Sequence, residues 1–367
     1  YPMKGVMVGG TGNKLGAISE YFDHGCQIFG SSHDICYTSN PSNMNYGYGS
    51  FYVGMNHSIE TNYGHFVAGT ANTISGNSSL TTIIGSGNNA RTMQAGTFCI
   101  GQGNGTPVGG NATAGAGCIG KDNVVHAIAS VAIGSGNTAS GNRSYCFGEG
   151  NSAERGILVG QDNTSKNAQT ILLGTNNTCS DGSRNMIAVG SENVNAVNST
   201  TMIAVGSGNT NVATATGNTV YLGFKGEAAS PNSLVTSFET GTAGAKQEVK
   251  SFLTAATTNA TPTVCTTKIY PKVDSAMGFS YTVMARRTDT DGHNAYWTGS
   301  GLITNEAGTV AIIGSVSKVE VAKVGFATVD IAFTADASDD TLILTVTGEA
   351  GETISWHAVV TQNIVVG

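Results

Sequence analysis

A short apolar segment that ends in glycine recurs along the middle of the chain. Ten of these segments end between Gly85 and Gly223, and successive glycines lie 12 to 19 residues apart. An asparagine follows three residues after each glycine from Gly69 to Gly206. The predicted structural turn residues are Gly85, Asn88, Gly101, Asn104, Gly120, Asn123, Gly134, Asn137, Gly148, Asn151, Gly160, Asn163, Gly174, Asn177, Gly190, Asn193, Gly206 and Asn209.

This spacing predicts a β-solenoid. A period of 12 to 19 residues is too short for a propeller blade or a helical repeat. It suits one coil made of two short strands and two turns. Glycine and asparagine tolerate positive φ best, so Gly-x-x-Asn is typical of a turn. Coils stacked at the strand spacing of about 4.8 Å would also let the asparagine side chains form hydrogen-bonded ladders.

Both faces of the repeated strand are apolar. The positions one and three before each glycine share a face, because side chains alternate along a strand, and the position between them faces the other way. A narrow roll buries only its interior, so the second face needs another surface, and we expect copies of the same chain. The position two before each glycine often holds a small residue, which predicts that three chains pack closely there. The predicted trimer interface is Ile83, Cys99, Cys118, Ala132, Cys146, Leu158, Leu172, Ala188 and Ala204.

Segments such as 130–142, SVAIGSGNTASGN, resemble the head repeats of trimeric autotransporter adhesins. The resemblance covers residues 67–223 and implies a trimer of left-handed parallel β-rolls. The chain departs from these adhesins because it shows no heptad stalk or membrane anchor, and its coils vary more in length. Similar rolls occur in bacteriophage tail fibres.

Residues 246–367 have a different pattern. Short runs of alternating polar and apolar residues are separated by turn sequences, which predicts an antiparallel β-sandwich. The stretches 283–288, 295–297, 305–309 and 354–358 resemble a domain at the C-terminal ends of phage and large-virus tail fibres. This second resemblance favours a virion fibre over a bacterial adhesin.

The sequence therefore predicts an all-β chain with four regions. Residues 1–66 form an aromatic-rich N-terminal cap with the first irregular coils, or alternatively an attachment region or an aromatic platform for sugars. Residues 67–223 form the homotrimeric left-handed parallel β-roll, which has about 14 coils when earlier weak repeats are included. Residues 224–245 are a linker, and residues 246–367 are the β-sandwich.

Composition narrows the function classes. The chain of 367 residues contains 51 Gly but only 6 Pro, with 11% charged residues and a net charge of −7. Lysine and arginine cluster only at Arg286-Arg287, so nucleic-acid binding is not expected. No apolar run approaches the roughly 18 residues of a membrane helix. The seven cysteines show no zinc spacing, and we expect them to act as small hydrophobic residues.

Local motifs give little sign of chemistry. The glycines of 115–120 match a nucleotide-binding pattern, but a β-coil follows where a helix is required. We find no catalytic motif, and we predict no enzyme activity, no cofactor and no metal. The candidate receptor-binding residues are Asp289, Asp291, His293, Tyr296, Trp297, Arg286 and Arg287. For these residues a hairpin turn, a strand-end ion pair and a core tryptophan are the structural alternatives.

From these observations we predict a non-enzymatic virion fibre or spike. A rigid trimeric rod would present the C-terminal domain to a host-surface receptor, which we expect to be a glycan. Expected partners are the chain itself, other fibre or virion proteins, and a host-surface glycan or protein, without membrane insertion. The alternatives are a bacterial adhesin passenger at the cell surface, a purely structural fibre, and a polysaccharide depolymerase.

Overall fold

The computed structural model describes residues 7–16, 26–36, 49–59, 64–75, 80–91, 96–106, 115–166, 169–183, 185–196, 201–211, 219–224, 227–228, 233–237, 246–271, 273–290 and 292–366. These residues form strands and turns, with no helix among them, so the predicted all-β class is confirmed. The chain divides into two compact units, Tyr1–Asn177 and Thr178–Gly367.

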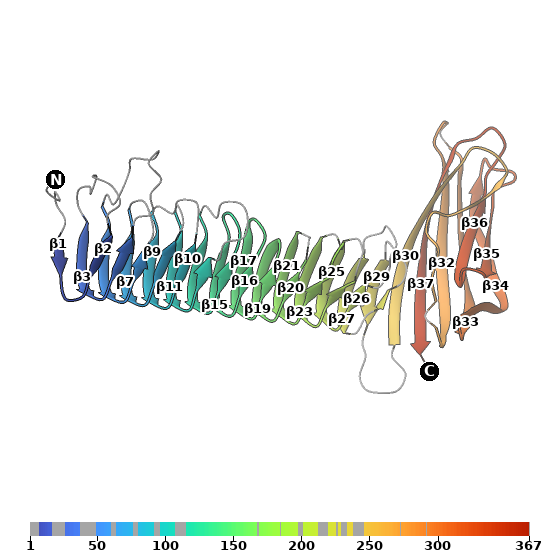
Figure 1. The fold of residues 1–367 in the computed structure, drawn as a ribbon. Coiled ribbons are helices and arrows are strands. Elements are labelled where there is room, and N and C mark those ends of the chain that lie inside the picture. Colours follow the sequence, from blue (N-terminus) through green and yellow to red (C-terminus); the bar gives the residue numbers. More distant parts are fainter. Residues whose placement is uncertain are drawn as a thin grey trace. The chain divides into compact units, whose positions relative to one another are not determined.

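The first unit is a parallel β-solenoid, and its longer strands form one sheet (Figure 1). Each strand pairs in parallel with the strand one coil later, and the repeated glycines lie in register, as in Gly120↔Gly134↔Gly148. The strands are β1 (Met7–Gly9), β3 (Gln27–Ser31), β5 (Phe51–Met55), β7 (Phe66–Thr70), β9 (Thr82–Ser86), β11 (Phe98–Gln102), β13 (Gly117–Lys121), β15 (Val131–Ser135), β17 (Ser144–Glu149), β19 (Gly156–Gln161) and β21 (Thr170–Thr175).

Ten shorter strands form the second sheet of this unit. They are β2 (Lys14–Gly16), β4 (Asp34–Cys36), β6 (Ser58–Ile59), β8 (Thr73–Ser75), β10 (Asn89–Arg91), β12 (Gly105–Thr106), β14 (Val124–Val125), β16 (Thr138–Ala139), β18 (Ser152–Ala153) and β20 (Thr164–Ser165). The described parts of the predicted N-terminal region, 1–66, therefore already contain regular coils, β1 to β6. Tyr21, Tyr37 and the other aromatic residues between these strands lie outside the described residues.

The Gly-x-x-Asn turn is held by a close backbone contact and a side-chain ladder. Gly134 has φ of 122°, and a Cβ on it would lie 1.9 Å from the carbonyl oxygen of Gly148 in the next coil. Buried Asn137 donates from Nδ2 to Oδ1 of Asn123 at 2.9 Å and to the Gly148 carbonyl at 2.7 Å. In the next coil, Asn151 donates from Nδ2 to Oδ1 of Asn137 in the same way, at 3.0 Å. The predicted asparagine ladder is confirmed.

The predicted trimer interface is wrong, because those side chains point into the interior of a single chain. All nine have 0% exposure: Ile83, Cys99, Cys118, Ala132, Cys146, Leu158, Leu172, Ala188 and Ala204. Alternation correctly separated the two faces but could not say which one is the interior. The small alanine and cysteine side chains fit the narrow space between the two sheets. The large aromatic residues of the other columns, such as Phe98 and Phe147, face outward.

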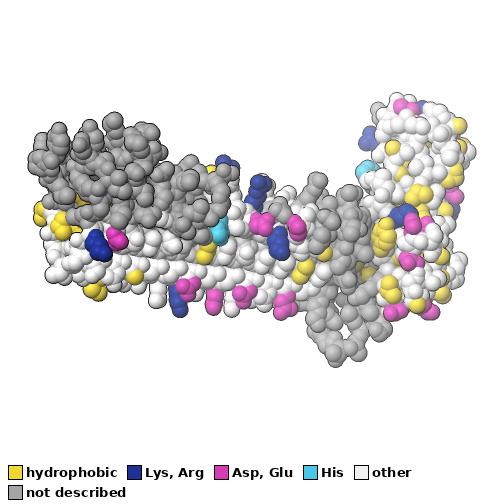
Figure 2. All heavy atoms as spheres, in the orientation of Figure 1, with side chains coloured by type: hydrophobic (Ala, Val, Ile, Leu, Met, Phe, Trp, Pro, Cys, Tyr) yellow, Lys and Arg dark blue, Asp and Glu magenta, His cyan; other side chains and the backbone are white. Residues whose placement is uncertain are grey.

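The outward face of the first sheet is therefore apolar and exposed. In the first unit, Ile84, Ile157, Val159, Ile171 and Leu173 each leave between 36% and 41% of the residue exposed. They belong to the columns one and three before the glycine, which the sequence analysis placed in the interior. Figure 2 shows that charged side chains cover little of the visible surface of the described residues.

The second unit begins with further parallel strands and then changes to antiparallel pairing. The parallel strands are β22 (Thr178–Cys179), β23 (Met186–Ser191), β24 (Val194–Asn195), β25 (Met202–Ser207), β26 (Thr210–Asn211), β27 (Thr219–Phe224), β28 (Glu227–Ala228) and β29 (Ser233–Ser237). Among the described residues, the short strands of the second sheet number ten in the first unit and four here, fourteen in total. Strands β28 and β29 lie within the predicted linker, 224–245. β29 pairs antiparallel with β30 (Lys246–Thr257).

The C-terminal part of this unit contains two antiparallel sheets. Beyond β30, the larger sheet has the order β37 (Ile354–Val366), β32 (Ser275–Arg287), β33 (Asn294–Glu306) and β34 (Thr309–Val324). The smaller sheet has the order β31 (Pro262–Val264), β36 (Thr341–Thr347) and β35 (Asp330–Asp336). Phe333 of the smaller sheet packs on Phe279 and Tyr281 of the larger one, with ring centroids 5.4 and 4.6 Å apart.

Candidate functional site

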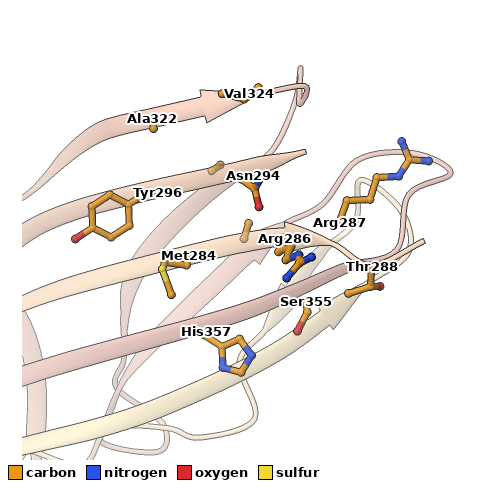
Figure 3. Close-up of a pocket in the computed structure, with 12 residues that line it drawn as sticks. Met284, Arg286, Arg287, Thr288, Asn294, Tyr296, Ala322, Val324, Ser355 and His357 are labelled. Atoms are coloured by element: carbon orange, nitrogen blue, oxygen red, sulfur yellow. The ribbon is translucent and has the colours of Figure 1, made fainter. Parts of the chain in front are cut away.

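A pocket with a volume of about 620 Å³ lies on the larger antiparallel sheet, near the ends of β32, β33, β34 and β37 (Figure 3). Strand alternation places most of its side chains on the face opposite the core. Along β37, Ser355 and His357 line the pocket, whereas Trp356 between them is 1% exposed. Along β33, Tyr296 lines the pocket and its neighbour Trp297 is fully buried. The pocket therefore rests on a packed core.

Strand register arranges the lining side chains in two adjacent rows. The first row runs across the four strands as His357, Met284, Tyr296 and Ala322. The second row is Ser355, Arg286, Asn294 and Val324. One row thus has an aromatic ring and a thioether at its centre, and the other has a guanidinium and an amide. A hollow lined by apolar and aromatic side chains beside a few hydrogen-bonding groups is typical of a small-molecule site.

The lining of the pocket includes two arginines and one histidine, and among the described residues it includes no aspartate or glutamate. The side chain of Arg287 is held by two carboxylates. Its Nε donates to Asp289, and its Nη1 donates to Glu352 Oε1 at 2.8 Å. Figure 3 shows Arg287 extending away from the other labelled side chains.

The ion pairs beside the pocket form a cluster of four residues. His293 Nδ1 lies 3.2 Å from Glu352 Oε1, so Glu352 bridges His293 and Arg287. The hydrogen bond and charge of Arg287 hold the pKa of Asp289 below its usual range. Asp289 Oδ2 also accepts from the backbone N–H of Thr353 at 3.2 Å. This cluster joins the ends of β32 and β37 and thereby fixes one end of the pocket.

The structure brings together some of the predicted receptor-binding residues. Arg286, Arg287 and Tyr296 line the pocket, while Asp289 and His293 belong to the neighbouring ion-pair cluster. The prediction for Trp297 is wrong, because its ring is buried and stacks on Trp356 with centroids 5.8 Å apart. Asp291 lies outside the described residues.

Sequence reasoning missed the other lining residues, among them the polar or large side chains of Met284, Asn294, Ser355 and His357. A signal for two of them was present, because a tryptophan in a β-sandwich is typically a core residue, and the neighbours of Trp356 on its strand then face outward. The juxtaposition of β37 with β32 was not readable, because these strands are far apart in the sequence.

Among the described residues, no group of three or more histidine, cysteine, aspartate or glutamate side chains could hold a metal ion. In the same part of the chain, no helix has the length and apolar character needed to cross a bilayer.

No protein-family model and no curated protein matches the chain. Among solved structures, the chain is similar to the tailspike protein gp49 of Acinetobacter baumannii bacteriophage Fri1, a capsular polysaccharide depolymerase. The alignment covers 97% of this chain and 66% of the tailspike chain, with 10% identity and a TM-score of 0.29. The chain thus spans less than two thirds of that protein.

This match contradicts the prediction that the chain is not an enzyme, because the similar protein cleaves a polysaccharide. The TM-score of 0.29 does not itself assign an activity to this chain. The prediction rested on the absence of local motifs. Carboxylate pairs that cleave glycosidic bonds come from positions with no fixed sequence spacing. Motif absence was therefore a weak basis for excluding cleavage.

Proposed function

We propose that this chain is a subunit of a virion tail fibre or spike, and that it attaches to a saccharide on the host surface. The observation that supports attachment most directly is the pocket on the C-terminal sheet. Tyr296 and Met284 offer a surface on which a sugar ring can stack, and the second row offers donors and acceptors for its hydroxyl groups.

The solenoid supports the mechanical part of this proposal. Each coil of the first unit is joined to the next by strand pairing and by the buried asparagine ladder. Such a stack resists bending and suits a protein that holds a binding domain away from its point of attachment. The resemblance of the repeats and of the C-terminal stretches to fibre proteins points the same way.

We also propose that the chain associates with copies of itself. The association surface is formed by the outward-facing positions one and three before each repeated glycine, and not by the buried position between them. A monomer rarely leaves a long apolar strip in contact with water, and such strips mark association surfaces. In the second unit the strip contains Ile187, Val189, Ile203 and Val205, each at least 37% exposed. The occupant we propose is a further copy of the same chain, with three copies in the particle. Three sites on one particle would strengthen weak single-site binding to a repeated glycan.

The test is binding of the purified protein to an array of bacterial surface polysaccharides, with release of reducing ends measured on every ligand. Tyr296→Ala is expected to reduce binding at least tenfold. Thr254→Ala, at an exposed site on the same sheet, serves as the control. Unchanged binding by Tyr296→Ala would exclude the pocket. The reducing-end measurement decides independently whether the bound polysaccharide is also cleaved.

A further inference from the structure

We propose that the pocket binds an internal stretch of a polysaccharide chain, which lies across the strands and leaves the pocket at both ends. This inference rests on the proposed function and adds which part of the polysaccharide is recognised. The starting observation is the direction of the two rows of lining side chains. Each row crosses four neighbouring strands in the order β37, β32, β33 and β34, so the rows run perpendicular to the strands (Figure 3).

The two rows give the pocket an oblong outline. Neighbouring strands lie about 4.8 Å apart, so the four strands span about 14 Å from β37 to β34. The rows are separated by two residues along each strand, as Asn294 and Tyr296 are on β33, which corresponds to about 7 Å. A hollow with these proportions is long enough for several linked sugar rings and wide enough for one.

The spacing of the side chains along the first row matches the repeat of a sugar chain. Side chains at paired positions of neighbouring strands follow one another at the strand spacing of about 4.8 Å. An extended chain of pyranose rings advances by nearly the same distance for each ring. Successive rings would therefore meet Tyr296 on β33, Met284 on β32 and His357 on β37, so that each strand contributes one contact.

Small side chains lie where a bound chain would leave the pocket. At one end the first row finishes at exposed Ala322 on β34, a strand that pairs only with β33 among the described residues. At the other end the second row continues from Ser355 to exposed Ala256 on β30. Methyl side chains leave room for a chain to continue over the sheet in both directions. A pocket that held only the last sugar of a chain would instead need a wall at one end.

The experiment narrows one exit at a time. The probe is the polysaccharide that gives the strongest signal on the array of bacterial surface polysaccharides, and the full chain carries either Ala322→Ile or Ala256→Ile. Isoleucine suits a strand position and adds neutral bulk without a ring on which a sugar could stack. Each substitution alone is expected to weaken binding about fivefold or more, because an internal stretch must pass both positions. A chain end would pass only one of them, so only one substitution would then weaken binding.

The matched control is Ser280→Ile, which adds bulk at an exposed position of β32 outside the pocket lining. It should leave binding unchanged. Unchanged binding by either alanine variant, while Tyr296→Ala still reduces binding, would overturn the internal-stretch inference and leave the attachment function intact. If no polysaccharide on the array binds, or if Tyr296→Ala binds normally, attachment through this pocket fails and the inference fails with it.

Discussion

The imidazole rings of His33 and His57 lie face to face, with centroids 4.9 Å apart and ring planes 13° from parallel. Both side chains are buried, and both occupy the turn position that asparagine holds from Asn72 onward. Asn72 N–H donates to His57 Nδ1 at 3.3 Å, and His57 Nε2 lies 3.1 Å from the Val53 carbonyl. The ring therefore accepts at one nitrogen and donates at the other, which is the arrangement of a neutral histidine.

The first coils are expected to lose stability in acid. Burial, with a smaller contribution from His33, lowers the pKa of His57, and burial lowers the pKa of His65 to about 4. The unfolded chain, with histidine pKa near 6.5, then binds more protons than the folded coils. Stability is complete above about pH 6.5 and falls as the pH drops towards 4. The shift of His65 alone corresponds to roughly 3 kcal/mol.

Hydrogen exchange, corrected for intrinsic rates, checks this prediction. Amide protection of residues 26–36 and 49–59 should fall between pH 7.5 and pH 5, while that of residues 131–165 should stay constant. The double variant His33→Asn/His57→Asn restores the asparagine ladder and should remove much of the loss, with His65 responsible for the remainder. Equal protection of the first coils at both pH values would contradict the prediction.

Loss of one ladder asparagine should destabilise the solenoid strongly. Asn137→Ala removes the acceptor for two donors of Asn151 and the donor to three oxygen atoms, all at a site with 0% exposure. Because the substitution leaves buried groups without hydrogen bonds, the free energy of unfolding is expected to fall by about 2–4 kcal/mol. The control is Asn142→Ala, because Asn142 is exposed and accepts a single bond from Ile128 N–H. Denaturant titration should separate the two variants clearly, and equal midpoints would refute the ladder's importance.

Two glycines of one turn should respond differently to alanine. Gly134→Ala places a Cβ against the Gly148 carbonyl, so the backbone must shift and the expected cost exceeds about 2 kcal/mol. Gly136 also has positive φ, of 64°, but the nearest atom to its added Cβ is 4.0 Å away. Gly136→Ala should therefore cost only about 1 kcal/mol. Thermal unfolding measures both, and a reversed order would contradict the close-contact argument.

The outward columns should control the mass of the particle. Light scattering of the wild-type protein is expected to give a mass near three times 37.3 kDa. The double variant Val159→Lys/Leu173→Lys places two charges on the exposed strip and should yield monomers with unchanged unfolding of the roll. Gln161→Lys, at an exposed site of the same strand β19, should remain assembled. A monomeric wild-type protein would refute self-association through this face.

The fold could be predicted from the sequence because each residue type that recurs in the repeat has a clear structural role. Glycine is needed where a carbonyl of the next coil leaves no room for Cβ, and asparagine is needed where each coil bonds to the last. The orientation of the strand was misread, because both its faces are apolar. Side-chain size does not separate the faces either, because the interior column also holds the fully buried rings of Tyr52 and Tyr221.

The candidate site was only partly readable. Alternation around Trp356 and Trp297 could have identified the outward positions on each strand separately. The pairing of β32 with β37 joins residues about seventy positions apart near the pocket, and no local sequence pattern predicts this pairing. The sequence therefore singled out Arg286 and Tyr296 but could not place His357 beside Met284.

The variation in coil length has an evolutionary consequence. The stretch from the longer strand through the glycine and asparagine to the shorter strand keeps its register from coil to coil. Length differences collect in the connection that follows, which is 140–143 in one coil and only 154–155 in the next. A gene can therefore gain or lose one whole coil by duplication or deletion without disturbing its neighbours, since each coil pairs only with the two beside it. Each such event would change the length of the solenoid by a fixed increment of about 4.8 Å.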